Sequence, residues 1–356
     1  MADLVLNVAI EKPGFSLQVK ESVPLDEITA VFGPSGSGKT TLLRIIAGLE
    51  PAARGTVVFD GQVWQDEHGS VPAHERAVGY VFQDARLFPH LTVERNLAFA
   101  LRHSRSRAAI GMSEVVSALD LTPLLARRPA SLSGGEQQRV AIGRALLTSP
   151  RVLLMDEPLS SLDMARKREI ISYIEELPGR FAIPVLYVTH DIDEVARLSN
   201  RMLLLSAGRM AAHGEVSEIL QRIDLWSSTG RLEAGSVIEA RIDRHADGMT
   251  HLAFETGRLQ IPAIDAVPGK RIRLRIHARD VAVATERPRH LSIRNVLPAT
   301  IEKIDLDETV HVELLLSVGA QTLRARITRG ALEDLGLAEG QFVHALIKSV
   351  LFEGRL

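Results

Sequence analysis

The chain has 356 residues, of which 46% are hydrophobic and 24% charged, and this composition excludes a disordered protein. The 42 basic and 44 acidic residues give a net charge of −2, which argues against nucleic acid as a partner. The absence of cysteine excludes disulfides and thiol chemistry. The sequence contains no run of 18 or more apolar residues, so it predicts no membrane span. The N-terminus carries an acidic residue at once and is unlike a signal peptide, so we expect a protein kept in the cytosol.

Short apolar runs alternate with helical stretches through the first two-thirds of the chain. The runs cover residues 27–32, 151–155, 184–189 and 202–205. This alternation predicts an α/β fold with a parallel sheet and crossover helices. Between about residues 87 and 148 helix formers dominate and strand signals stop, which predicts a helical subdomain inserted into the α/β core.

A stretch rich in Ser, Gly and Thr at residues 224–236 predicts a domain boundary, giving an N-terminal domain at 1–230 and a β-barrel region at 231–356. Beyond it, hydrophobic residues alternate with polar ones at 271–276 and 310–314, as in antiparallel barrels. Residues 269–281 can be laid on 340–352, with Ile276 on Ile347, which suggests two similar five-stranded units. A chance match between two alternating strands is the alternative.

A glycine-rich loop fits the pattern G-x-x-x-x-G-K-[ST] and lies between a strand-like run and a helical one. Its backbone amides can surround phosphate, Lys39 can reach the β- and γ-phosphates, and Thr40 can offer its hydroxyl to Mg²⁺. A structural glycine turn is the competing explanation. The predicted nucleotide-binding residues are Gly33, Pro34, Ser35, Gly36, Ser37, Gly38, Lys39, Thr40 and Thr41.

Four polar residues at the ends of apolar runs complete a predicted ATP and Mg²⁺ site. Asp156 is placed to hold Mg²⁺, and Glu157 to polarise an attacking water. Gln83 carries an amide that can ligate Mg²⁺, and His190 can contact the γ-phosphate or hold the water of Glu157. Each residue alone is compatible with a surface or structural role, so the interpretation depends on their combination.

The segment Leu-Ser-Gly-Gly-Glu-Gln-Gln-Arg at 132–139 resembles the signature of ABC-transporter ATPases. With the motifs above and Ser-Leu-Asp at 161–163, the resemblance covers about residues 1–222 and implies a P-loop NTPase core. In this family the signature closes on nucleotide held by a second copy. The resemblance therefore implies a homodimer with two ATP between its subunits, bound also by Ser133, Gly134, Gly135 and Glu136. An upstream aromatic that stacks on adenine is usual in the family, and only Phe15 is a candidate.

Residues 79–91 resemble the ATPases of molybdate importers, the ModC type. This resemblance implies membrane permease subunits, an extracytoplasmic molybdate-binding protein, and a peripheral position on the cytoplasmic face of the inner membrane. Phe88 and Leu91 would contact the permease, or serve as ordinary core residues. An importer of sulfate, iron or sugar, and an oxyanion-sensing regulatory protein, are the alternatives.

Residues 291–297 resemble the start of a Mop-type molybdate-binding domain, a five-stranded barrel of the OB type, expected here at about 290–356. A tetrahedral dianion needs cationic and hydroxyl donors. The resemblance makes molybdate a regulatory ligand, unless these residues belong to a scaffold barrel. The matching positions are Ser292, Ile293, Arg294, Thr328, Lys348 and Ser349.

Overall fold

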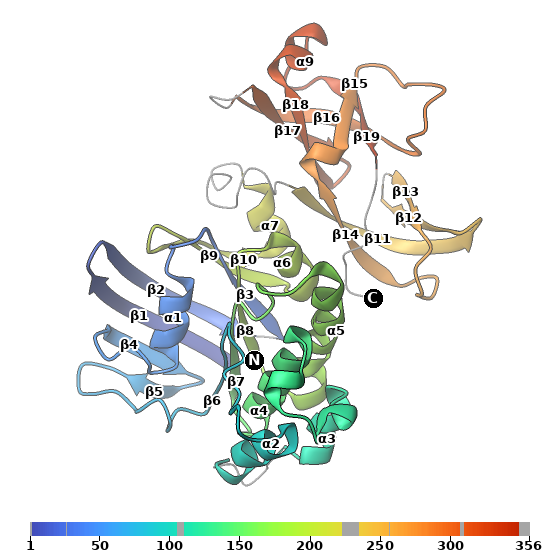
Figure 1. Cartoon of the computed structure of the whole chain (residues 1–356). Helices are drawn as coiled ribbons and strands as arrows, with labels where there is room; N and C mark the ends of the chain where they lie inside the picture. The colour runs from blue at the N-terminus through green and yellow to red at the C-terminus, as the bar shows by residue number, and fades with distance from the viewer. Residues whose placement is uncertain are drawn as a thin grey trace. The chain divides into compact units, whose positions relative to one another are not determined.

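The structure is a computed structural model that describes residues 2–25, 27–104, 110–222, 235–255, 257–306 and 310–348. It divides into two compact units, Met1–Gly214 and Glu215–Leu356, each of which is described by itself (Figure 1). Among the residues described, no helix is both long and apolar enough to cross a membrane.

The first unit is built on a ten-stranded sheet, counted over the described residues, in the order β5-β4-β1-β2-β10-β9-β3-β8-β7-β6. The parallel strands β3, β6, β7, β8 and β9 form its centre and one edge. Strands β3, β7 and β8 are buried at every residue, because helices cover both faces, which explains their continuous apolar runs. The parallel sheet predicted from these runs is confirmed. The strand bounds are β1 Ala2–Lys12, β2 Phe15–Leu25, β3 Ile28–Phe32, β4 Arg54–Phe59, β5 Gln62–Gln65, β6 Val78–Val81, β7 Val152–Asp156, β8 Val185–Thr189, β9 Arg201–Ser206 and β10 Arg209–Glu215.

The other edge of this sheet is antiparallel, which the sequence analysis did not predict. Strand β1 pairs with both β2 and β4 along most of its length. Its inward residues Leu4, Leu6, Val8 and Ile10 alternate with exposed ones, so one face packs on the core and the other faces solvent.

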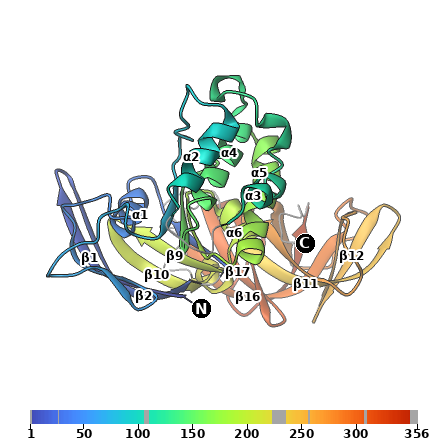
Figure 2. The same ribbon diagram turned by 90° about the horizontal axis from the view of Figure 1, so that it is seen from below.

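In the part of the first unit that the structure describes, six helices surround the sheet or stand beside it. Figure 2 shows α2, α3 and α4 gathered on one side, away from the strands, as the predicted helical subdomain. Buried residues such as Leu97, Leu119 and Val140 join these helices in one apolar cluster with α5. The helix bounds are α1 Lys39–Ile46, α2 Val93–Arg102, α3 Met112–Ala118, α4 Gly134–Leu146, α5 Met164–Phe181 and α6 Ile192–Leu198, with 3₁₀ turns at Thr122–Leu124 and Pro129–Ser131.

In the second unit, two antiparallel sheets share one hydrophobic core. The first has the order β13-β12-β11-β14 and the second β15-β19-β16-β17-β18. This all-β architecture confirms the predicted class of the C-terminal region. The bounds are α7 Val216–Gln221, β11 Gly235–Ala246, β12 Met249–Phe254, β13 Gly257–Pro262, β14 Arg271–His277, a 3₁₀ turn at Ala278–Asp280, β15 Val281–Ala284, β16 Asn295–Leu306, β17 His311–Val318, β18 Gln321–Thr328, α9 Arg329–Asp334 and β19 Phe342–Ile347.

The internal repeat is confirmed by hydrogen bonds at equivalent positions. Ile242 of β11 accepts from Gly269 N at 2.7 Å, and Ile301 of β16 accepts from Gly340 N at 2.7 Å. A β-bulge follows each isoleucine in its strand. The expected pair of five-stranded units is wrong in one respect: β15, which follows the first repeat, pairs with β19 of the second.

Two polar side chains tie the repeats together reciprocally. Ser236 is the second residue of β11, and its hydroxyl accepts from Arg324 N of the second repeat at 2.8 Å. Asn295, the equivalent residue of β16, accepts from Gln260 N of the first repeat at 2.7 Å and donates to Gln260 O at 3.0 Å. Each repeat therefore satisfies backbone groups of the other in the shared interior.

Candidate nucleotide-binding site

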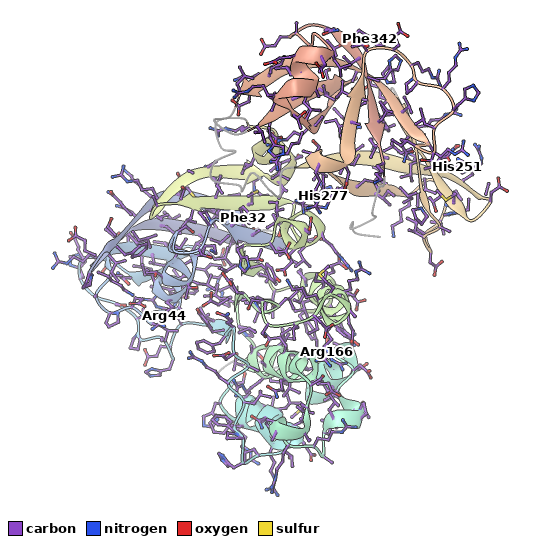
Figure 3. All side chains as sticks on the ribbon, turned by 45° about the horizontal axis from the view of Figure 1, so that its top comes forward. Phe32, Arg44, Arg166, His251, His277 and Phe342 are labelled. Atoms are coloured by element: carbon purple, nitrogen blue, oxygen red, sulfur yellow. The ribbon has the colours of Figure 1, made fainter. Side chains whose placement is uncertain are left out.

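The phosphate loop spans residues 33–38 between β3 and α1; Phe32, the last residue of β3, and Arg44, in the last turn of α1, are labelled in Figure 3. Two glycines are required by its geometry. Gly33 has φ +155°, and a Cβ there would lie 2.1 Å from Leu205 O. Gly38 has φ +104°, and its Cβ would press on Phe15 at 2.8 Å. The loop can therefore turn tightly with its amides free of side chains.

Lys39 is the cation at the centre of the loop. Its side chain is 4% exposed, and Nζ donates to Gly33 O at 2.8 Å and Pro34 O at 3.1 Å. Glu157 Oε1 lies 3.7 Å from the same atom. Burial lowers the pKa of Lys39, against the opposing charges of Glu157 and Asp156. If a phosphate entered the loop, the Lys39 ammonium would exchange these neutral carbonyl acceptors for charged phosphate oxygens, which form stronger hydrogen bonds.

Asp156 ends β7 and is held by two hydroxyl groups. Thr40 Oγ1 donates to Oδ1 at 2.8 Å, and Tyr80 OH donates to Oδ2 at 3.0 Å. Burial raises the pKa of Asp156, and the two hydrogen bonds oppose that rise. The sequence analysis missed Tyr80. The sequence feature that could have identified Tyr80 is its place in the strand-like run just before Gln83, which became β6, the neighbour of β7 in the sheet.

Glu157 adopts an uncommon backbone conformation for a residue with a side chain, with φ +46°. Its amide donates to Val188 O at 3.0 Å, and its Oε2 lies 3.1 Å from His190 Nδ1. His190 is half exposed, whereas Glu157 is 19% exposed. The carboxylate is therefore aimed between Lys39 and His190, and the strained backbone is a feature that clusters at functional sites.

A cavity of about 540 Å³ lies over the phosphate loop. Phe15 belongs to its wall, beside the loop and the carboxylate of Glu157. The lining residues are Gly14, Phe15, Ser35, Gly36, Gly38, Lys39, Thr40, Thr41 and Glu157. The structure thus gathers most of the predicted loop residues around one space, together with the predicted base.

The signature residues lie outside that lining, at the start of α4. Ser133 is the N-cap: its hydroxyl accepts from Glu136 N at 3.3 Å, while Glu136 Oε2 accepts from Ser133 N at 2.6 Å. The backbone hydrogen bond from Ser133 is the main cause that lowers the pKa of Glu136. Gly134 lies close to Leu162: a Cβ added at this glycine would be only 3.0 Å from Leu162 Cδ2. Gln83 is exposed in the turn after β6.

The tail residues matched to the Mop-type motif divide between two ends of the second sheet. Ser292 and Arg294 are exposed just before β16, and Ile293 between them is partly buried. Lys348 follows β19, whose Ile347 pairs with Asn295, so Arg294 and Lys348 lie at the same end. Thr328 pairs with His311, the first residue of β17, and therefore lies at the other end of the sheet from Arg294 and Lys348. Its hydroxyl accepts from Ala331 N and caps α9. Ser349 lies outside the described residues.

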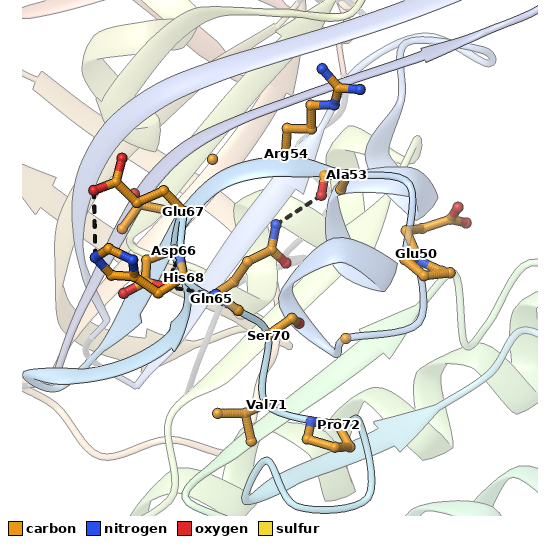
Figure 4. A pocket seen from close by; sticks show the side chains of 15 residues that line it. Glu50, Ala53, Arg54, Gln65, Asp66, Glu67, His68, Ser70, Val71 and Pro72 are labelled. Atoms are coloured by element: carbon orange, nitrogen blue, oxygen red, sulfur yellow. Dashed lines mark hydrogen bonds and ion pairs between the residues drawn. The ribbon is translucent and has the colours of Figure 1, made fainter.

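A second, larger cavity of about 900 Å³ is lined by the loops around β4 and β5 (Figure 4). Its lining contains none of the predicted site residues. Glu50 on its rim is paired with Lys12 and Arg44, and Gln65 donates to Ala53 O at 3.0 Å. Its polar groups therefore serve local structure.

Comparison with known proteins finds two matching family models. The family model "ABC transporter" matches residues 17–160, and the model "TOBE domain" matches residues 291–350. CbiO1 from Clostridium perfringens, described as part of an ABC transporter complex, is 24% identical with a TM-score of 0.52, over 63% of this chain and 92% of that one, which shows the fold. The class defined by fold and site is therefore the ATP-binding cassette protein.

Relatives of the full chain define the family more narrowly. "Molybdenum import ATP-binding protein ModC 1" of Azotobacter vinelandii is 46% identical over 97% of both chains. "Molybdenum import ATP-binding protein ModC" of Pseudomonas aeruginosa is 47% identical over 95% of this chain and 96% of that one. The chain belongs to the ModC family of molybdenum import ATP-binding proteins.

Proposed function

We propose that this chain is the ATP-hydrolysing subunit of a membrane importer for molybdate. The observation that carries the proposal is the convergence of Lys39, Glu157 and His190 beside the phosphate loop. The names of the full-length relatives supply the cargo.

The nucleotide is bound by the loop and by α1. Backbone N–H groups of Gly33, of residues 35–38 and of the start of α1 face the β- and γ-phosphates, since both features favour anions. Lys39 exchanges the carbonyls of Gly33 and Pro34 for phosphate oxygens. Phe15, the aromatic candidate from the sequence, belongs to the cavity wall, which supports a role in stacking on the adenine.

The donor set at the end of β7 fits Mg²⁺, which prefers oxygen ligands and retains several waters. Thr40 Oγ1 and the Asp156 carboxylate already lie 2.8 Å apart, and the Gln83 amide is the third candidate ligand. When bound, Mg²⁺ neutralises charge that develops on the phosphates. Tyr80 fixes the orientation of Asp156 for this task.

Hydrolysis depends on Glu157 as the general base. Its carboxylate accepts a proton from the attacking water, while His190 Nδ1 holds the other carboxylate oxygen and fixes its direction. His190, half exposed, presents its remaining ring edge toward the γ-phosphate. Lys39 stabilises negative charge on the phosphoryl group in the transition state.

The second half of each site comes from another copy of the chain. The signature, Ser133, Gly134, Gly135 and Glu136, lies outside the cavity that holds Lys39 and Glu157. A homodimer with two ATP at its interface brings the α4 N-terminus of one subunit to the γ-phosphate bound by the other. Closure on ATP and opening after hydrolysis drives transport.

The permease docks beside the helical subdomain. A cavity of about 330 Å³ there is lined by aromatic and cationic side chains, including Phe88, Phe99, His103 and Arg144. Phe99 is 43% exposed although apolar. A helix from a membrane permease, working with an extracytoplasmic molybdate-binding protein, would cover this surface. The chain would then sit on the cytoplasmic face of the inner membrane.

Asn96 shapes this docking surface and was missed by the sequence analysis. It is fully buried, and its side chain bonds Phe88 N, Phe88 O, Leu91 O and Thr92 O. One amide therefore fixes the turn that carries the two predicted permease contacts.

Molybdate is also proposed as a regulatory ligand of the C-terminal unit. Ser292, Ile293, Arg294 and Lys348 lie at one end of the second sheet and supply two cations and a hydroxyl for a dianion. Thr328 lies at the opposite end, so it would join this site only from another chain; Ser349 is the remaining candidate.

Uptake into vesicles tests the main proposal. Protein reconstituted with its permease and binding protein should import labelled molybdate only with ATP and Mg²⁺, and not sulfate. Glu157→Gln should abolish uptake while retaining ATP binding. Uptake of sulfate but not molybdate would refute the cargo. Calorimetric titration of molybdate, with Arg294→Ala beside the unmodified chain, tests the regulatory site; binding unchanged in Arg294→Ala would refute it.

A further inference from the structure

A buried polar network lies behind His190, outside the catalytic groups already described. Its centre is Glu194 on α6, whose side chain is 5% exposed. Its Oε2 accepts from Tyr187 OH at 2.8 Å and from Thr189 Oγ1 at 2.7 Å, and its Oε1 accepts from Lys167 Nζ at 3.0 Å. A carboxylate this buried needs such donors, because an unpaired one would be strongly destabilising.

The network holds the backbone on both sides of His190. Thr189 precedes it, and the Thr189 hydroxyl both donates to Glu194 and accepts from Asp191 N at 3.0 Å. Asp191 follows it, and Asp191 Oδ2 lies 3.3 Å from Lys167 Nζ. The backbone is thus held on both sides of His190, whose ring contacts Glu157.

Lys167 connects this turn to α5. Its amide donates to Asp163 O at 2.9 Å, so it lies one turn inside the helix that begins after Ser-Leu-Asp. Arg166, labelled in Figure 3, is its neighbour on that first turn. Burial alone would lower the pKa of Lys167, but its bonds and charge interactions with Glu194 and Asp191 raise it overall. The ammonium therefore stays charged between two carboxylates.

The first turn of α5 and the residue before its N-cap lie beside the signature: a Cβ at Gly135 would lie 3.7 Å from Arg166 Cβ, and one at Gly134 would lie 3.0 Å from Leu162 Cδ2. Asp163 follows Leu162, and its carbonyl oxygen accepts from the amide of Lys167, whose Nζ donates to Glu194. Glu194 in turn accepts from the hydroxyl of Thr189, the residue before His190. We propose that Lys167 and Glu194 are positioning residues that hold His190 against Glu157 and tie its position to the first turn of α5. The inference rests on the proposed ATPase function, and neither residue lines the cavity over the phosphate loop.

The same two helices provide a matched control. Arg197 of α6 pairs with Glu175 of α5 at 3.0 Å, and this ion pair is also partly buried. It has no bond to Thr189 or Asp191 among those recorded for the described residues. Removing it takes away an ion pair between the same two helices and leaves the bonds of Thr189 and Asp191 in place.

The test compares ATP hydrolysis by Lys167→Met, Glu194→Gln, Lys167→Arg and Arg197→Met in the full chain. We expect Lys167→Met and Glu194→Gln to lower kcat by about tenfold or more with KM for ATP changed less than about twofold, because a small displacement of a catalytic group is costly. Lys167→Arg should recover most of kcat, and Arg197→Met should retain it. Thermal unfolding should shift similarly for the two methionine variants.

A double-mutant cycle with His190→Gln separates positioning from general stability. If Lys167 acts through His190, Lys167→Met should add less than about a twofold loss in the His190→Gln background, measured in single turnovers. Additive losses, an unchanged kcat in Lys167→Met, or an equal loss in Arg197→Met would overturn the proposal. The ATPase function itself stands if the unmodified chain hydrolyses ATP and Glu157→Gln does so at least about a hundredfold more slowly; a chain that fails to hydrolyse ATP overturns both.

Discussion

Arg76 fastens the far end of the phosphate-loop helix, and its removal is the most quantitative perturbation that the structure offers. It is 3% exposed and its guanidinium donates to Ile45 O at 2.8 Å and Ile46 O at 2.7 Å, both at the C-terminal end of α1. It also donates to Val71 O, Trp64 O and Ser70 Oγ. Burial lowers the pKa of this group, so its charge is tolerated only because the donors are used.

The expected loss in Arg76→Met follows from the carbonyls left behind. Ile45 O and Trp64 O keep a second donor each, from Gly48 N and Val71 N. For Ile46 O and Val71 O the structure records Arg76 as the donor. Leaving two buried carbonyls without a donor, at about 1–3 kcal/mol each, would lower the free energy of unfolding by about 2–6 kcal/mol. Because the variant also removes a buried charge, we expect a loss in the lower half of this range, about 3 kcal/mol.

Urea denaturation followed by tryptophan fluorescence measures this loss. Trp64 is buried, and Arg76 lies 5.9 Å from its ring centroid, so it reports on the same site. Trp226→Phe makes Trp64 the single reporter. The exposed Arg54→Met is the control, expected within about 0.5 kcal/mol of the parent. A loss below about 1 kcal/mol in Arg76→Met would refute the carbonyl argument.

Four further outcomes are expected. Glu157→Gln should bind ATP, hydrolyse it about a hundredfold or more slowly and accumulate closed dimers in size-exclusion chromatography, and normal turnover would remove Glu157 from the base role. Tyr80→Phe frees one oxygen of Asp156 and should raise the Mg²⁺ concentration for half-maximal activity severalfold; an unchanged titration would show that the hydroxyl orients nothing. Asn96→Ala should impair permease-coupled uptake more than basal ATPase activity, because it releases the Phe88 turn, and equal losses would contradict this. Gly48→Ala, with φ +75° and a Cβ 2.8 Å from Arg76 Nε, should destabilise by about 1–3 kcal/mol, and by less in Arg76→Met; full additivity would show that the contact is unimportant.

The parallel strands could be predicted from sequence because burial on both faces leaves no polar alternation. The run at 184–189 became β8, Val185–Thr189, and the run at 151–155 became β7, Val152–Asp156. The polar residues after such strands converge at one sheet edge, so Glu157 and His190 meet as expected from topology. The antiparallel edge carried a period-two signal at Leu4, Leu6, Val8 and Ile10 that was not used.

Buried polar groups were the part that sequence could not supply. Asn96, Arg76 and Glu194 belong to residue types that are mostly exposed, so no pattern separates them from surface residues. Their roles depend on backbone groups brought close by the fold, such as Phe88 O for Asn96 or Ile46 O for Arg76. The similarity between the two tail repeats was visible in the sequence. The pairing of β15, which follows the first repeat, with β19 of the second was not.

The reciprocal bonds of Ser236 and Asn295 have a consequence for how such a tail is inherited. Each repeat completes the other, and β15 of the first extends the sheet of the second, so one repeat alone would expose unsatisfied backbone and an open strand edge. A gene shortened by one repeat would therefore encode an aggregation-prone fragment and not a half-sized folded unit. Relatives that differ in this region are expected to gain or lose the pair together.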